Sequence, residues 1–300
     1  MILMDLRDLR PPVEDGPWPP ITHFPPMTQR PVDGAQSWSG LSYALIDGYR
    51  PLVMDVHVPL GVAHAPVVLW VHGGGWATGD RRHTPLQWGQ QRMFERLLGA
   101  GLAVATPDYR LTAEAALPAP VHDLTAAVRY LRHYATQLRL DTDRIGVWGD
   151  SAGAHLVTLA GLAGSAGIRD PWLLGEAGVA GERTDVRAIV YWYGASDLTV
   201  LPDLQALLWP DADPDHRAEL ARRCSPVTYL RPDSPPLLVM HGDRDTMAPL
   251  DQAVRLKQAA DAAGATCELV VVPGAEHVFL GAAIEPQWDH AIAFLTSQLT

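Results

Sequence analysis

The chain has 300 residues and is 47% hydrophobic, which suits one large globular domain or one domain with a small cap. Acidic residues outnumber basic ones by 34 to 23, giving a formal net charge of −11, which argues against nucleic acid as a partner and gives no reason to expect binding to an anionic membrane. No apolar run approaches the roughly 18 residues of a membrane span, and charged residues follow Met4 at once, so a cytoplasmic protein without a signal peptide is expected.

Residues 1–38 are rich in proline and lack a hydrophobic period. Such a composition predicts an extended N-terminal arm rather than a folded domain. The remainder, residues 39–300, is predicted to form one domain. The sequence leaves open whether the arm wraps this domain, covers the mouth of a pocket or has no fixed structure.

Short apolar segments alternate with helix-like segments along this domain. Strands are expected at 52–58, 67–71, 102–106, 144–148, 187–193, 236–240 and 268–272, and helices near 84–99, 120–138, 152–163, 250–263 and 286–299. This alternation predicts an α/β fold with a mostly parallel central sheet flanked by helices. Functional loops then gather at the carboxyl ends of the strands.

Two segments interrupt the alternation. Residues 164–185 are rich in Gly and Ala, and residues 196–232 contain Trp209, several acidic residues and a short helical stretch. Because the second segment lies between two expected strands, it is a candidate cap insertion over a pocket. The two cysteines, Cys224 and Cys267, form no framework, and the sequence leaves open whether they are separate thiols or one bridge.

The first chemistry-bearing motif, His-Gly-Gly-Gly-Trp at residues 72–76, follows the second expected strand. Successive glycines let backbone N–H groups approach a ligand closely. Acyl transfer needs such donors at the developing oxyanion, each worth about 3–4 kcal/mol. We therefore expect an oxyanion hole formed by Gly74, Gly75 and Ala152, with Trp76 as an alternative donor. The histidine of this motif is expected to orient the loop rather than to act as a base.

The second motif is Gly-Asp-Ser-Ala-Gly at residues 149–153, between a buried-strand pattern and an Ala- and Leu-rich helical pattern. A serine on such a sharp strand-to-helix turn exposes its Oγ, and the flanking glycines avoid collisions with the adjacent strand and helix. The pattern predicts Ser151 as a catalytic nucleophile. His155, on the following helix, is expected to be a packing or surface residue.

A carboxylate that orients a catalytic imidazole must lie just past a strand end. The strand expected at 236–240 runs into His-Gly-Asp-Arg-Asp, and Asp245 is the preferred triad acid, with Asp243 as a turn stabiliser. Asp197 follows an earlier strand and is a further rival, for which the role of a helix cap is favoured.

The last expected strand leads to His277, which lies before the final helix. As a general base it would take the proton of Ser151 Oγ and pass it to the leaving group. The chain order Ser151, Asp245, His277 is the order expected for a serine on a strand-to-helix elbow.

Together these motifs resemble those of carboxylesterases of the α/β-hydrolase fold, in particular the hormone-sensitive-lipase-like and feruloyl/acetylxylan-esterase-like bacterial esterases. The resemblance covers about residues 40–300 and includes Asp-Tyr-Arg-Leu at 108–111. It implies a Ser-Asp-His triad and an oxyanion hole made by the glycine loop and the residue after the nucleophile. It does not cover the arm or residues 196–232 in detail, and those parts set the choice of substrate.

The expected activity is hydrolysis of short-chain or aryl carboxylic esters through an acyl-enzyme on Ser151, with a small-molecule ester as partner and no metal or other cofactor. Trp76, Tyr193 and Trp209 are expected to bind the substrate as pocket walls, although strand alternation makes some of these aromatic residues core residues instead. The alternatives are an arylformamidase-like amide hydrolase, a carbohydrate-ester deacetylase and a non-catalytic small-molecule-binding protein on the same scaffold. A homodimer is compatible with the sequence, but no sequence feature supports it.

Overall fold

An eight-stranded sheet forms the centre of the molecule in the computed structural model, which describes residues 32–82, 84–89 and 92–300. Its strand order is β1-β2-β4-β3-β5-β6-β7-β8. The strands are β1 (Ala35–Ala44), β2 (Leu52–Pro59), β3 (Ala65–Val71), β4 (Ala103–Pro107), β5 (Leu140–Asp150), β6 (Ala188–Trp192), β7 (Leu237–Gly242) and β8 (Cys267–Val272). Strands β1 and β2 are antiparallel to their neighbours, and all the other pairs are parallel.

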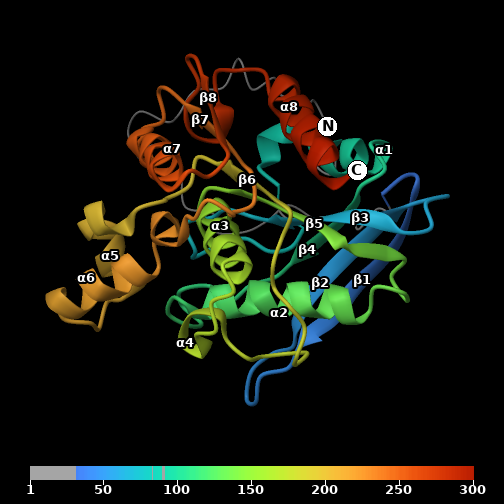
Figure 1. The fold of residues 1–300 in the computed structure, drawn as a ribbon, viewed down its shortest axis with the longest axis horizontal. Coiled ribbons are helices and arrows are strands. Elements are labelled where there is room, and N and C mark those ends of the chain that lie inside the picture. Colours follow the sequence, from blue (N-terminus) through green and yellow to red (C-terminus); the bar gives the residue numbers. More distant parts are fainter. Residues whose placement is uncertain (1–31, 83, 90–91) are drawn as a thin grey trace.

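Helices cover both faces of this sheet. They are α1 (Arg92–Gly99), α2 (Ala119–His133), α3 (Ala152–Ser165), α4 (Pro171–Leu174), α5 (Pro202–Leu208), α6 (Pro214–Arg223), α7 (Asp251–Ala263) and α8 (Glu285–Leu299). Figure 1 shows α1 and α8 on one side of the sheet and α2 and α3 on the other. Each side has its own hydrophobic core, one built with α1 and α8 and the other with α2, α3 and α7.

The side chains of a single strand divide between these two cores. In β3, Val67 and Leu69 face the core under α2 and α3, whereas Val68 and Trp70 face the core under α1 and α8. This alternation follows from the two-residue period of a strand. Because both faces are covered, the strands read as unbroken apolar runs, and their carboxyl ends are where polar loops can gather.

The predicted α/β architecture is confirmed, and all seven expected strands are present. Strand β1 was not expected. It is an edge strand whose side chains are mostly exposed and whose pairing with β2 has two irregularities, so it has no clear apolar alternation. It begins at Ala35, inside the segment predicted to be an arm, and residues 1–31 of that arm lie outside the described residues.

The helix expected near 84–99 is shorter in the structure. The α-helix covers Arg92–Gly99, and Leu86–Trp88 form one turn of 3-10 helix bounded by Pro85 and Gly89. The two cysteines are separate thiols: Cys224 is buried and Cys267 lies at the start of β8.

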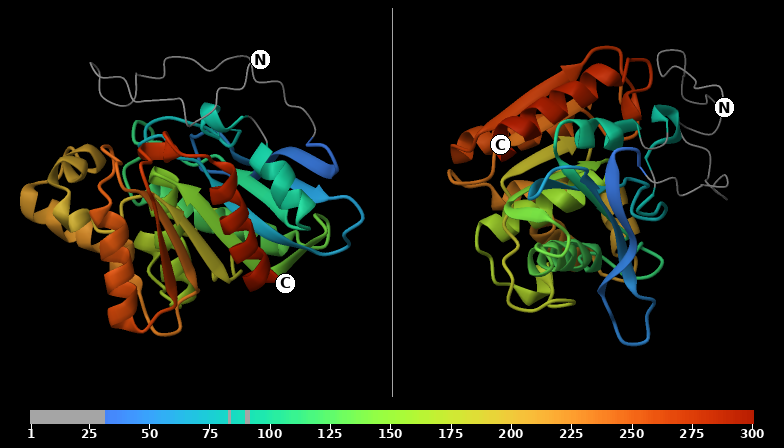
Figure 2. Two further views of the ribbon diagram at one scale, coloured as in Figure 1. Left: turned by 90° about the horizontal axis from the view of Figure 1, so that it is seen from above. Right: turned by 90° about the vertical axis from the view of Figure 1, so that its right-hand side faces the viewer.

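The segment 196–232, the candidate cap insertion, lies between β6 and β7 and is largely helical. It contains α5, α6 and two short 3-10 turns, Leu198–Val200 and Pro226–Tyr229. Figure 2 (left) shows α5 and α6 beside α7, at one end of the sheet. This position brings the insertion to the loops that follow the carboxyl ends of the central strands.

Candidate active site

Ser151 stands on a sharp turn between β5 and α3. Its φ is +51°, a conformation that is costly for a residue with a side chain. A Cβ on Gly149 would lie 2.4 Å from the backbone of Gly153, and a Cβ on Gly153 would lie 2.1 Å from Val71 O. Only glycine fits at these two positions, so the sequence enforces a turn that presents Ser151 Oγ at its tip.

Three side chains from separate loops form a continuous hydrogen-bonded chain. The Nε2 atom of His277 is 3.0 Å from Ser151 Oγ, and Nδ1 of the same ring is 2.7 Å from Asp245 Oδ2. Since a carboxylate only accepts, His277 donates from Nδ1 and offers the Nε2 lone pair to the serine hydroxyl. The structure therefore brings together the three residues that the sequence singled out as a triad.

The carboxylate of Asp245 is buried and fully engaged. Its Oδ1 accepts hydrogen bonds from the backbone N–H groups of Met247 (2.9 Å) and Ala248 (2.8 Å), and its Oδ2 lies 3.2 Å from Nε2 of His241 as well as close to His277. Burial alone would raise the pKa of Asp245, but the hydrogen bonds from His241 and His277 outweigh it and hold that pKa well below its ordinary value. Asp245 is thus a fixed negative charge beside the imidazole.

The two rival acids occupy other positions. Asp243 accepts a hydrogen bond from Gly274 N at 2.6 Å and so stabilises the turn after β8. Asp197 caps the turn Leu198–Val200 by accepting from Thr199 N and also approaches Arg255 at 3.5 Å. Of the three acids, Asp245 is the one that contacts His277.

Hydrogen bonds and a ring contact hold the glycine loop, residues 72–76, in place. Gly73 N donates to Asp150 Oδ1 at 2.7 Å, and His72 Nδ1 donates to Gly73 O at 2.7 Å while its ring stacks on Tyr109 at 4.4 Å. Burial lowers the pKa of His72 to about 4 and raises the pKa of Asp150 to about 7. His72 therefore orients the loop, as the sequence predicts.

The expected oxyanion donors are the backbone N–H groups of Gly74, Gly75 and Ala152. Gly74 and Gly75 have φ values of +109° and +61°, and a Cβ on Gly74 would lie 2.2 Å from Thr78 O. Gly75 lines the same cavity as Ser151. Ala152 opens α3, and the first N–H groups of a helix have no partner within the helix. Gly75 therefore shares the cavity with Ser151 and Ala152 follows it in the chain, whereas Gly74 is not among the residues that line the cavity.

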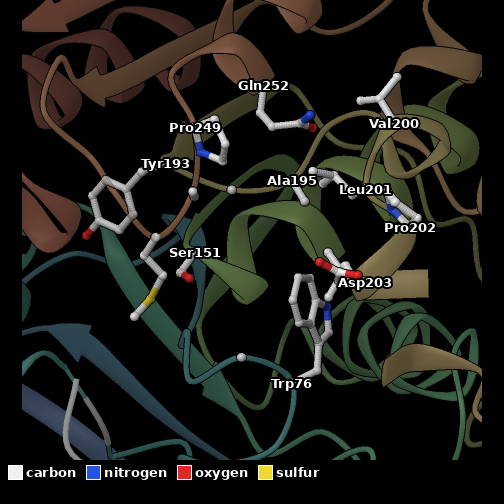
Figure 3. A pocket seen from close by; sticks show the side chains of 15 residues that line it. Trp76, Ser151, Tyr193, Ala195, Val200, Leu201, Pro202, Asp203, Pro249 and Gln252 are labelled. Atoms are coloured by element: carbon white, nitrogen blue, oxygen red, sulfur yellow. The ribbon is translucent and has the colours of Figure 1, made fainter. Parts of the chain in front are cut away.

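A cavity of about 480 Å³ opens beside Ser151. Figure 3 shows the side chains that line it, among them Trp76 and Tyr193. Trp209, which was also expected in the wall, is not among the lining residues. It is buried in the core under α2 and α3, and its Nε1 donates to Leu117 O at 2.8 Å. Its position depends on how the insertion folds, which a local sequence pattern does not encode.

Most of the cavity wall carries no signal in the sequence. The missed side chains come from the loop after β6, from the segment 196–232, from the loop that leads into α7 and from the first turn of α7, and they are Ala195, Val200, Leu201, Pro202, Asp203, Leu204, Met247, Ala248, Pro249 and Gln252. Apolar residues in irregular segments have no period that marks them as lining a pocket. The candidate cap insertion at 196–232 was the one signal in the sequence that pointed to this region.

The sheet and the site together define the class of protein. The sheet is mostly parallel, the serine elbow follows β5, the acid follows β7 and the histidine follows β8, which is the arrangement of the α/β-hydrolase fold. The chain belongs to the BD-FAE family, whose model matches residues 54–260. Within the described residues, no helix is both long and apolar enough to cross a membrane.

Two relatives from Mycobacterium tuberculosis are named esterases. Esterase LipC is 30% identical over 249 residues, which are 78% of this chain and 59% of LipC, and esterase LipQ is 29% identical over 225 residues, which are 72% of this chain and 50% of LipQ. The chain thus spans about half the length of the curated relatives that it matches.

Solved structures share the fold. A truncated carbohydrate esterase from gut microbiota superposes with a TM-score of 0.74 at 25% identity, covering 88% of this chain and 96% of that one. Esterase 2 of Thermogutta terrifontis, solved with propionate, superposes with a TM-score of 0.70 at 22% identity, covering 89% of this chain and 95% of that one.

Proposed function

We propose that the chain is a serine carboxylesterase that hydrolyses short-chain or aryl esters through an acyl-enzyme on Ser151. The observation that carries this proposal is the hydrogen-bonded chain from Ser151 Oγ through His277 to the buried carboxylate of Asp245. Relatives named esterases, which share about 30% identity with this chain, support the same reaction class.

The reaction takes two steps. In the first, Ser151 Oγ attacks the ester carbonyl while its proton passes to Nε2 of His277, and the same proton then protonates the leaving alcohol. In the second, His277 takes a proton from water, the hydroxide attacks the acyl-enzyme, and the proton returns to Ser151 as the carboxylic acid leaves. Asp245 stabilises the transient imidazolium in both steps.

Backbone donors hold the negative charge that develops on the carbonyl oxygen. We assign this role to the N–H groups of Gly75, Ala152 and Gly74, the same positions that the sequence suggests. Asp150 holds the loop in place by accepting from Gly73 N, so these donors need no rearrangement during the reaction.

The cavity takes the acyl group of the ester. The leaving alcohol must lie within reach of His277 Nε2, which protonates it, and His277 is not among the residues that line the cavity. The acyl group therefore extends in the other direction, between Trp76 and the segment 200–204. An apolar wall of this kind favours an aliphatic or aryl acyl group over a charged one.

A carbohydrate ester is the second candidate. The observation that favours it is the match to a truncated carbohydrate esterase, which covers nearly all of that protein. In this case the acetyl group would occupy the cavity and the sugar would lie outside it as the leaving alcohol.

Hydrolysis of p-nitrophenyl acetate, butyrate, octanoate and laurate by the wild type and by Ser151→Ala tests the proposal. We expect activity on the short esters that Ser151→Ala loses. Acetylated xylose and N-formylkynurenine, assayed in parallel, distinguish sugar-ester and formamide hydrolysis. Activity that survives in Ser151→Ala, or a wild type inactive on every ester, contradicts the proposal.

A further inference from the structure

His155 is a buried imidazole that the proposed reaction does not use. It lies in α3, one turn after the nucleophile, has no exposed surface, and its backbone N–H donates to Ser151 O at 3.2 Å. A buried polar side chain is costly unless its polar atoms are hydrogen-bonded. Both ring nitrogens of His155 have a partner: Trp76, which lines the cavity, and Cys224, which does not line it but is connected to the segment that supplies residues 200–204.

The two partners fix the state of the ring. The indole Nε1 of Trp76 is 3.2 Å from His155 Nδ1, and His155 Nε2 is 2.8 Å from Cys224 O. An indole N–H only donates and a carbonyl only accepts, so Nδ1 is the acceptor and Nε2 carries the proton. Burial lowers the pKa of His155 to about 4, in agreement with a neutral ring.

Nδ1 of His155 contacts Trp76, which forms the first wall of the cavity. Trp76 lines the cavity and its ring meets that of His155 edge to face, with 5.5 Å between centroids. The Trp76 backbone has a φ of +60°, directly after Gly75, so the side chain leaves a strained loop. The hydrogen bond to His155 is what fixes the direction of this indole.

Nε2 of His155 is connected, through Cys224, to the second wall of the cavity, which is formed by residues 200–204. Cys224 follows the end of α6, and the next residue, Ser225, accepts from Leu198 N at 2.8 Å and donates to Ala221 O at 2.7 Å. Leu198 begins the turn that leads into residues 200–204, which line the cavity together with Trp76. His155 therefore anchors the base of the insertion to the helix of the nucleophile.

We propose that His155 is a positioning residue that sets the width of the cavity, and thereby the acyl-chain length that the protein accepts, by tying both walls to the helix that begins after Ser151. This inference rests on the proposed function. One methylene in an apolar pocket changes kcat/KM by roughly 10- to 200-fold, so a small displacement of either wall changes the length preference measurably.

The test compares covalent labelling of Ser151 by p-nitrophenyl methyl-, butyl- and octylphosphonates, followed by p-nitrophenolate release and by mass. In His155→Leu, which removes both hydrogen bonds, we expect the ratio of octyl to methyl labelling rates to rise about 10-fold. Trp76→Phe, which loses one donor, is expected to raise the ratio less. His155→Gln, which keeps a donor and an acceptor, is expected to return it toward the wild-type value.

Trp38→Phe is the matched control, because Trp38 lies in the edge strand β1 and does not line the cavity. Its labelling ratio is expected to equal that of the wild type. A folded His155→Leu that slows all chain lengths equally overturns the inference and leaves His155 a purely structural residue. If His155→Leu does not fold, an unchanged ratio in Trp76→Phe overturns it in the same way.

The labelling separates this inference from the proposed function, because it requires a nucleophilic serine but no turnover of a carboxylic ester. A wild type that is labelled yet hydrolyses no ester contradicts the proposed function, and the labelling ratios still decide the role of His155. A wild type that is not labelled on Ser151 contradicts both.

Discussion

The two sides of the cavity are built by different means. On the triad side, the residues follow β5, β7 and β8, and the Asp245 side chain has 0% exposure and two backbone N–H partners. On the opposite side, the wall comes from an insertion with short helices, where Val200 and Asp203 are exposed. The ends of the strands thus position the triad, whereas side-chain hydrogen bonds such as those of His155 determine the shape of the pocket.

The largest effect is expected on the triad side. Asp245→Asn leaves the volume unchanged but places an amide N–H group beside His277, which favours the wrong tautomer of the imidazole. We expect kcat on p-nitrophenyl butyrate to fall about 10⁴-fold, as in other Ser-His-Asp sites. Asp197→Asn is the control, since Asp197 caps a turn in the insertion, and its kcat should stay within a few-fold of the wild type. Equal losses in both variants would remove the distinction between the two sides.

The same contrast explains what the sequence could predict. Ser151, Asp245 and His277 each follow a strand, so period, turn residues and chain order locate them. Trp209 could not be placed, because its contact with Leu117 O depends on how two segments distant in sequence pack. Strand β1 was missed because an exposed, irregular edge strand lacks an apolar period.

A substitution in the strand-to-helix turn that carries Ser151 is expected to have a smaller effect, on the stability of the fold. In Gly153→Ala the new methyl group would lie 2.1 Å from Val71 O, which is backbone and cannot move aside cheaply. We expect the free energy of unfolding to fall by about 3 kcal/mol, measured by urea denaturation. The matched control is Gly99→Ala, at the end of α1, where a Cβ meets nothing within 4 Å and the change should stay within about 0.5 kcal/mol. A Gly153→Ala variant as stable as this control would contradict the geometry of the elbow.

Asp150 makes the triad side sensitive to pH. Its pKa is raised from 3.8 to about 7 by burial, so the folded state holds a proton that the unfolded state has lost. The stabilisation of the folded state by this protonated side chain is fully present below pH 3.8 and is lost as the pH rises through 7. Between pH 5 and pH 7 the free energy of unfolding therefore falls by about 2 kcal/mol. Because Asp150→Asn cannot titrate, its free energy of unfolding, measured by urea denaturation at pH 5 and pH 7, should not show this fall. An identical pH dependence in both proteins would contradict the assignment.

The smallest effect is expected from a substitution in the segment 196–232, and it concerns substrate preference. Among the described residues that line the cavity, Asp203 is the one with a charged side chain. It is exposed and therefore screened, so Asp203→Asn should raise kcat/KM for an ester with an anionic acyl chain, p-nitrophenyl hemisuccinate, by only about 3-fold relative to the butyrate. Asp215→Asn, in α6 and not in the wall, should leave the ratio unchanged. A ratio that does not move in Asp203→Asn would mean that the acyl group does not pass this wall.

In the proposed reaction, Ser151 carries the acyl group. Rapid acid quenching of the protein with p-nitrophenyl butyrate, followed by mass spectrometry of its peptides, tests it most directly. We expect a butyryl group on the peptide that contains Ser151, formed during the first turnover and absent in Ser151→Ala. Ester turnover without this adduct, or a butyryl group on another residue that persists in Ser151→Ala, would contradict it.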